Sequence, residues 1–155
     1  MNRLHPRIRL LWVGRSLLTA VIFAGIVFGV GRVVDPAWLP AWAPAAVLVA
    51  FGGLGSAFAV LRYRAWRFEV REDSLYLERG VLTKVRTVVP FVRIQHVDTS
   101  RSPTERLAGL ASTVVYTAGS RGADVSVPGL TPGDADDLRE RLKRLAIRSE
   151  GEDAV

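Results

Sequence analysis

The chain reads SLLTAVIFAGIVFGVG from Ser16 to Gly31 and PAWLPAWAPAAVLVAFGGLGSAFAVL from Pro36 to Leu61, and neither stretch contains a charged residue. A helix that crosses the hydrocarbon core of a bilayer needs about 20 apolar residues. Flanking residues lengthen the first stretch to a span at about 12–33, because interfacial arginines extend their charges into the headgroups. Prolines and tryptophans before residue 43 predict a turn and an interfacial belt, which leaves the second span at about 43–61. Residues 1–65 are therefore predicted to form a transmembrane hairpin.

Two other interpretations of these apolar stretches are weaker. Arg3, Arg7, Arg9 and Arg15 resemble the basic region of a cleaved signal peptide. The first stretch is longer than a usual signal sequence, however, and a second span begins almost at once. A buried helix pair in a water-soluble protein keeps a polar face, which 26 consecutive uncharged residues do not provide.

Basic and aromatic residues flank the two predicted spans. We expect the interfacial anchors to be Arg15, Arg32, Trp38, Trp42, Arg62 and Arg64. Four arginines precede the first span and four follow the second, whereas the connecting loop contains Arg32 and Asp35. The positive-inside rule then places both termini in the cytoplasm. The prediction is a multi-pass protein of the plasma membrane with a short external loop.

The distribution of charge excludes several classes of function. The net charge of +6 lies entirely in the first 66 residues, because the remainder carries fourteen basic and fourteen acidic side chains. A nucleic-acid binder needs a basic excess on a folded surface, so no nucleic-acid partner is expected. The chain has no cysteine, which excludes disulfides, thiolate nucleophiles and cysteine-ligated metals.

After residue 66 the pattern changes to short segments in which polar and apolar residues alternate, as in half-buried strands. Strands are predicted at 67–70, 75–78, 85–89, 94–99, 112–118 and 124–127, with a helical turn at 103–109 and a hairpin turn at 119–122. A helix is predicted at 132–148, because Pro132 suits its first position and Ala135, Leu138, Leu142 and Leu145 form one apolar stripe. Residues 149–155 are expected to be a disordered tail.

Four stretches of this second half, taken in order, resemble a known family. They are LYLERGVL at 75–82, VPFVRIQHV at 89–97, SPTERLAGL at 102–110 and VVYTAG at 114–119. Together they resemble the bacterial pleckstrin-homology-like domain of membrane-flanked proteins, over residues 66–148 and with the two membrane helices usual in that family.

The resemblance implies an α+β membrane protein. Its hairpin would precede a bent antiparallel sheet or partly open barrel of seven strands, where the residue pattern gives about six, and the C-terminal amphipathic helix would lie across one opening. Eukaryotic pleckstrin-homology domains that bind phosphoinositides use basic residues in the first hairpin. Here that turn contains Glu72 and Asp73, which argues against a phosphoinositide site.

The catalytic inventory is small. The sequence contains no HExxH, GxSxG or Walker A motif. His96 and Asp98 share one face of a predicted strand, but a structural or exposed histidine is commoner than a catalytic one. We therefore expect no catalytic residue, no cofactor and no metal site, and we expect that the protein is not an enzyme.

Arg93, Arg101 and Arg106 are the candidate patch for an anionic lipid or an acidic partner, because each basic residue near an anionic leaflet contributes about 1 kcal/mol. Alternatively, Arg93 and Arg106 form internal salt bridges, for instance with Glu105 or Asp98. The hypothesis is a non-enzymatic, membrane-anchored interaction module at the cytoplasmic membrane face, which binds a membrane protein partner or anionic lipid.

Two questions stay open at this point. Gly25 and Gly29 form a GxxxG motif, which suits either close helix contact within a homo-oligomer or the ordinary glycine content of membrane helices. The alternative function is an accessory subunit of a membrane enzyme or transporter. That role needs polar residues facing the interior of the helix pair, and the spans offer Ser16, Thr19 and Ser56.

Overall fold

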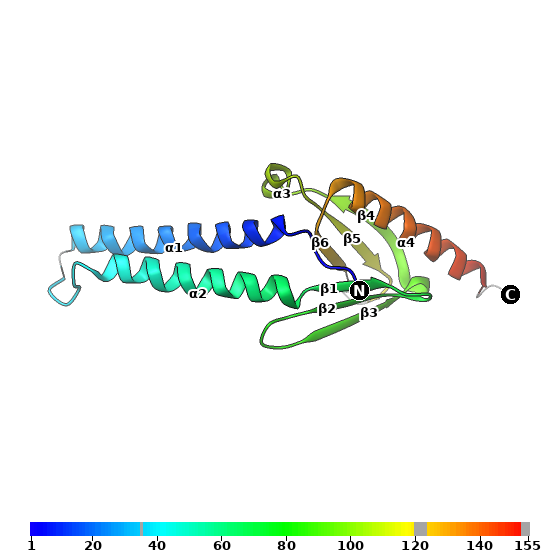
Figure 1. Cartoon of the computed structure of the whole chain (residues 1–155), viewed down its shortest axis with the longest axis horizontal. Coiled ribbons are helices and arrows are strands. Elements are labelled where there is room, and N and C mark those ends of the chain that lie inside the picture. The colour runs from blue at the N-terminus through cyan, green and yellow to red at the C-terminus, as the bar shows by residue number, and fades with distance from the viewer. Residues whose placement is uncertain (35, 120–123, 153–155) are drawn as a thin grey trace.

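The structure is a computed structural model that describes residues 1–34, 36–119 and 124–152. Two long helices lie side by side at one end of the molecule, and a β-rich domain with a C-terminal helix lies at the other (Figure 1). Helix α1 is Arg7–Val33 and helix α2 is Ala43–Ala65. At 1.5 Å per residue, α1 is about 40 Å long, which exceeds the thickness of a bilayer core of about 30 Å.

Both helices are long and apolar enough to cross a membrane. The mean hydropathy of their most apolar segments is 2.0 in α1 and 1.9 in α2, yet only 6% and 11% of those residues are buried inside the protein. The core helix of a soluble protein would bury such residues. The structure therefore contains the predicted hairpin, as two antiparallel helices whose apolar side chains face outward.

Small residues set the contact between the two helices. A Cβ atom at Gly55 would lie 2.9 Å from Ser16 Cβ, and a Cβ at Gly52 would lie 3.4 Å from Leu17. The backbones approach closely at these points because glycine has no side chain. Gly25 and Gly29 have no such neighbour within 4 Å, so their GxxxG motif is not used inside the hairpin.

The domain contains two three-stranded antiparallel sheets. The first has the order β1 (Arg67–Val70), β2 (Ser74–Arg79), β3 (Val85–Pro90), and the second has the order β4 (Ile94–Ser100), β5 (Ala111–Thr117), β6 (Val125–Leu130). All six predicted strands are present, with ends shifted by up to three residues. The sheets do not close into a barrel, which agrees with the open form of the predicted fold.

Three helical segments complete the domain. A 3-10 turn, η1 (Phe91–Arg93), links the two sheets and was not predicted. Helix α3 (Pro103–Ala108) begins with a capping box, in which Ser102 and Glu105 bond each other's backbone N–H groups. Helix α4 (Pro132–Glu152) begins where predicted but continues past residue 148. Residues 149–152 are thus helical rather than part of a disordered tail, and residues 153–155 lie outside the described residues, as do 120–123 in the predicted hairpin turn.

Helix α4 covers the sheets through the apolar stripe seen in the sequence. Ala135, Leu138 and Leu142 are buried, and Leu145 is packed against the same core. This core also contains Phe91 from η1 and Val115 from the second sheet. Burial of a leucine side chain stabilises a fold by about 1.5–3 kcal/mol, so the stripe holds α4 on the sheets and not on lipid.

The N-terminal segment, residues 2–8, belongs to the domain, although the hairpin lies between this segment and the rest of the domain in the sequence. Asn2 and Phe68 exchange two backbone hydrogen bonds, of 2.7 and 3.1 Å, and His5 N–H donates to the carbonyl oxygen of Gly129 at 2.7 Å. Leu4 and Ile8 are buried in the core of the domain. The predicted boundary at residue 66 therefore leaves out part of the domain, because this short segment bridges the edge of β1 to that of β6.

Candidate functional site

An open groove lies between α4, β1 and the first three residues of the chain, and we term it the edge groove. It has a volume of about 480 Å³. Its apolar lining comes from Phe68, Val70, Leu130 and Leu138. Its charged lining comes from α4 and from the N-terminal segment, and consists of Arg3, Asp134, Asp137 and Arg141.

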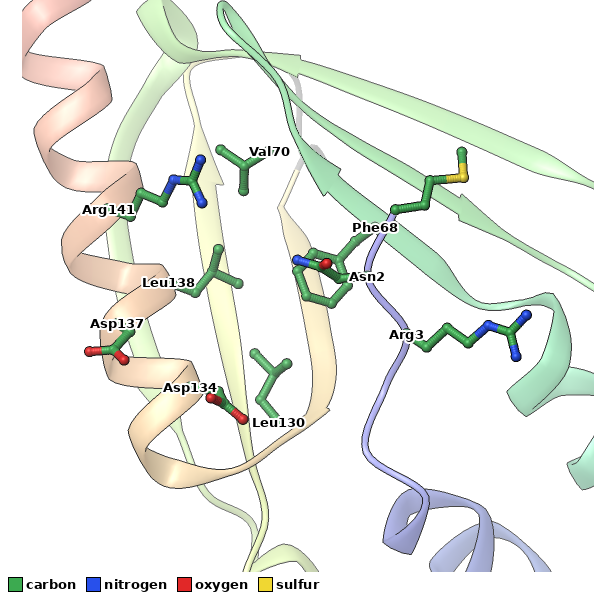
Figure 2. Close-up of a pocket in the computed structure, with 10 residues that line it drawn as sticks. Asn2, Arg3, Phe68, Val70, Leu130, Asp134, Asp137, Leu138 and Arg141 are labelled. Carbon is green, nitrogen blue, oxygen red and sulfur yellow. The ribbon is translucent and has the colours of Figure 1, made fainter.

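Figure 2 shows how these side chains lie. Leu138 and Arg141 extend from α4 toward the strand that carries Val70, whereas Arg3 and Asp137 point away from the space between them. Apolar side chains and Arg141 thus face the groove, and the other charged side chains lie nearer its rim. A protein interface typically has this arrangement, with an apolar centre inside a polar rim.

The backbone of β1 also faces this groove. Phe68 uses both of its backbone groups to bond Asn2 at the outer edge of the sheet. Backbone groups two residues apart on a strand point to the same edge, so Val70 directs its N–H and C=O to that edge as well. The N-terminal segment shows that an extended chain fits between the two sheets.

His96 and Asp98 lie together on an exposed face of β4, as their spacing predicted. His96 Nε2 is 3.0 Å from Asp98 Oδ1, and both side chains are exposed. A hollow of about 460 Å³ between β4 and α4 also contains Arg139 and Lys143. Among the described residues, no three His, Asp or Glu side chains are grouped closely enough to hold a metal ion.

The three arginines of the predicted patch are not brought together. Arg93 lies in η1, and the seven residues of β4 separate it from Arg101 and from Arg106 in α3. A strand of this length spans about 20 Å. Within the described chain neither Arg93 nor Arg106 forms an ion pair, so the internal salt bridges suggested for them are not formed.

Arg101 has a structural contact instead. Its Nε donates to the carbonyl oxygen of Leu110 at 3.2 Å, and its charge acts on the carboxylate of Glu105. Burial raises the pKa of Glu105, but hydrogen bonds from Ser112 and Ser102 and the charge of Arg101 outweigh it, so that the pKa lies below its ordinary value of 4.5. The ionised Glu105 therefore fixes α3 to the start of β5.

The predicted interfacial residues lie at the two ends of the hairpin. Trp38 and Trp42 are exposed in the connecting loop, and the Arg32 guanidinium lies 5.7 Å from the ring centre of Phe28. At the end near the domain, Arg62 lies 4.4 Å from the ring centre of Trp12. Arg15 and Arg64 are exposed at this same end.

The aromatic residues at the end of the hairpin near the domain were not predicted from the sequence. Arg9 lies 5.9 Å from the ring centre of Tyr63, beside the pair formed by Arg62 and Trp12. From Trp12 to Val33 the helix rises about 32 Å, which matches a bilayer core of about 30 Å. Trp38 and Trp42 mark one membrane boundary in the sequence. Aromatic residues at the other end of each span, Trp12 and Tyr63, could have been identified from their separation from these tryptophans by about one span.

The hydroxyl groups of α1 bond to their own helix. Ser16 Oγ donates to the carbonyl oxygen of Val13 at 2.8 Å, and Thr19 Oγ1 donates to that of Arg15 at 2.9 Å. Both hydroxyls therefore already have a hydrogen-bond acceptor within the helix.

Comparison with known proteins adds two findings. A family model described as "Bacterial PH domain" matches residues 10–146. The chain is also 32% identical, over 150 residues, to the UPF0699 transmembrane protein YdbS of Bacillus subtilis (strain 168), a match that covers 94% of this chain and 92% of that protein. No solved structure matches the chain.

Proposed function

The chain belongs to the bacterial PH domain family and is an integral membrane protein, and from this premise we propose that it is a non-enzymatic interaction module. Its hairpin holds the domain at the cytoplasmic face of the plasma membrane, where the edge groove binds an extended segment of a membrane protein partner. The observation that carries this proposal is the groove itself, which places an open strand edge beside an apolar surface with a charged rim.

An extended segment suits the groove because β1 has backbone groups to pair with it. Peptides that add a strand to a sheet edge gain affinity from main-chain hydrogen bonds and specificity from pockets for alternate side chains. The N-terminal segment already pairs with Phe68 in this way. A partner segment would pair with the backbone of Val70, with its apolar side chains on Val70 and Leu138.

A protein partner fits the edge groove better than anionic lipid does. Its charged lining sets Asp134 and Asp137 against Arg3 and Arg141, so the groove has no net positive charge to attract an anionic headgroup. Both signs of charge at the rim instead favour a segment that carries charges of both signs. An accessory role beside a membrane enzyme or transporter is the alternative, and there the same groove would contact the larger subunit.

The arginine distribution supports the cytoplasmic location. Four arginines lie at the start of the first span and four follow the second span, and both groups are on the side of the hairpin next to the domain. Basic residues that flank a span favour the cytoplasmic side. The N-terminal segment packs against the domain. Residues 2–8 and the domain consequently lie on one side of the membrane, as two spans require.

The test is site-specific photocrosslinking of the full-length chain in native membranes. A crosslinking residue at Val70 should capture one defined membrane protein, and the same residue at Val88, exposed on β3, should not. Arg141→Glu in the groove should abolish that crosslink, while Arg144→Glu, exposed elsewhere on α4, should retain it. Identical crosslinks from positions 70 and 88, or an unchanged crosslink in Arg141→Glu, would contradict the proposal.

A further inference from the structure

Two leucines of the domain are almost fully exposed. Leu82 is 92% exposed and Leu107 is 90% exposed, although leucine is among the residues most often buried. Leu82 lies in the turn between β2 and β3, and Leu107 lies in α3. Their positions relative to the hairpin explain why such side chains face outward.

Leu82 lies at the end of the domain next to the membrane helices. The first residue of β1, Arg67, follows α2 almost directly and pairs with Glu78. Arg79 and the turn up to Lys84 therefore extend past the start of β1, back toward the hairpin. Figure 1 shows this turn pointing to the same side as the two long helices.

The turn that carries Leu82 has a defined shape. Gly80 has a φ of +107°, a conformation that side chains rarely adopt. A Cβ atom at Gly80 would collide with the carbonyl oxygen of Thr83. The exposure of Leu82 thus results from a tight turn built around this glycine.

Leu107 lies at the same end, beside the start of α1. A hollow of about 610 Å³ is lined on one side by Arg7, Leu10 and Leu11 of α1. Residues Arg106–Gly109 line its other side. Figure 1 likewise shows α3 next to the first turns of α1. The two exposed leucines therefore lie on the face of the domain from which the hairpin leaves, and we term this face the base.

Exposed basic residues surround both leucines on the base. Arg79, Lys84 and Arg86 flank Leu82, while Arg7 and Arg106 flank Leu107. Within the described part of the chain none of the five forms an ion pair.

Two acids, Glu78 and Glu105, also lie near the leucines. Glu78 accepts a hydrogen bond of 3.5 Å from the Tyr76 hydroxyl, and Glu105 accepts from Ser102 and Ser112. Three basic residues near Leu82 outnumber Glu78, and two near Leu107 outnumber Glu105, so each leucine of the base is an apolar tip in a region of net positive charge.

We propose that the base of the domain docks on the bilayer that contains its own hairpin, with Leu82 and Leu107 inserted among the acyl chains and the five basic residues on anionic headgroups. An apolar tip with basic residues beside it matches a surface whose polar layer is anionic and whose interior is apolar. Contacts on either side of the hairpin fix the orientation of the domain. This inference is independent of the edge groove, which lies on a different set of residues.

The test uses the absence of native cysteine. Leu82→Cys, Leu107→Cys and Val92→Cys are made singly in the full-length chain and labelled with a nitroxide. Each is placed in nanodiscs of phosphatidylcholine, with or without phosphatidylglycerol. Val92 is exposed in η1, at the end of β4 opposite α3, and serves as the control. Power-saturation measurements then compare collisions with oxygen and with a water-soluble nickel complex.

With phosphatidylglycerol present, labels at 82 and 107 should be reached by oxygen and shielded from nickel, whereas the label at 92 should be reached by nickel. Equal nickel accessibility at all three positions would overturn the docking. Labels at 82 and 107 should become more accessible to nickel in discs of phosphatidylcholine alone. Unchanged shielding there would overturn the part assigned to the basic residues.

Discussion

The hairpin and the domain use the same apolar residues in opposite ways. Leu18 of α1 is 61% exposed, whereas Leu75 and Leu142 in the domain are completely buried. In lipid, a leucine gains little by leaving the solvent for another helix, so the hairpin contact relies on small residues such as Gly55. In water, burial is favourable, and the domain forms a packed core. The comparison shows that the energetic consequence of an exposed leucine depends on whether lipid or water surrounds it.

The two regions are nevertheless coupled through the N-terminal segment. It precedes α1 in sequence but packs in the domain, where Leu4 and Ile8 are buried and the Tyr63 hydroxyl of α2 donates to the Leu4 carbonyl oxygen at 3.1 Å. Substitutions in residues 2–8 should therefore act on the sheets. Substitutions farther along α1, at lipid-facing positions such as Leu18, should not.

The largest effect is expected from Gly129→Val. Gly129 has a φ of +66°, and a Cβ atom there would lie 2.8 Å from Ile8 Cβ. The left-handed conformation costs a side chain about 1–2 kcal/mol, and overpacking adds about 1–3 kcal/mol. The free energy of unfolding should fall by about 4 kcal/mol, with loss of amide-exchange protection in β1 and β6. Gly133→Ala, with open space around it, should cause no loss, and equal effects of the two changes would contradict the coupling.

The second prediction compares the substitution of leucine by alanine in the domain core and on the lipid-facing surface of the hairpin. Leu4→Ala removes buried side-chain atoms and leaves a cavity, so it should lower the free energy of unfolding of the domain by about 2–5 kcal/mol. Leu18→Ala faces lipid and should change it by less than about 0.5 kcal/mol. Denaturant unfolding of the nanodisc-embedded chain, followed through domain fluorescence, measures both. A similar loss in the two variants would show that residues 2–8 are not part of the domain.

A smaller and pH-dependent effect is expected at Glu105, which caps α3. Glu105→Gln should lower the free energy of unfolding by about 1–2 kcal/mol at neutral pH, since it weakens the capping box and the bonds from Ser102 and Ser112. Because the pKa of Glu105 is lower in the folded state, its stabilisation is present above pH 4.5 and is lost as the pH falls below that value.

The measurement is unfolding of both chains between neutral pH and about pH 3. The stability difference between wild type and Glu105→Gln should shrink as the pH falls. A difference that stays constant over this range would show that the ionised carboxylate is not what holds α3 in place.

The elements could be predicted from sequence where a local pattern encodes them. Uncharged runs specify the hairpin, and alternation specifies strands such as β1 and β5. The N-terminal segment escaped prediction because its residues have no strand pattern, and their partners Phe68 and Gly129 are far away in the chain. The edge groove escaped for the same reason, since it is defined by the gap that this segment leaves between the sheets.

The candidate residues show a similar limit. Arg93 and Arg106 were grouped because both are basic and lie close in sequence, yet β4 holds them at opposite ends of one sheet. The predicted strand at 94–99 already contained that information. The exposure of Leu82 and Leu107 was not predictable, because apolar residues near turns ordinarily pack into a core.

Cysteine accessibility on intact cells tests the membrane arrangement most directly. Ala37→Cys lies in the loop between the helices, and Glu150→Cys is exposed near the end of α4. A membrane-impermeant maleimide should label position 37 in intact cells, and should label position 150 only after the cells are opened. Labelling of position 150 in intact cells, or recovery of the full-length chain in the aqueous fraction without detergent, would contradict a hairpin that spans the bilayer with the domain on its cytoplasmic side.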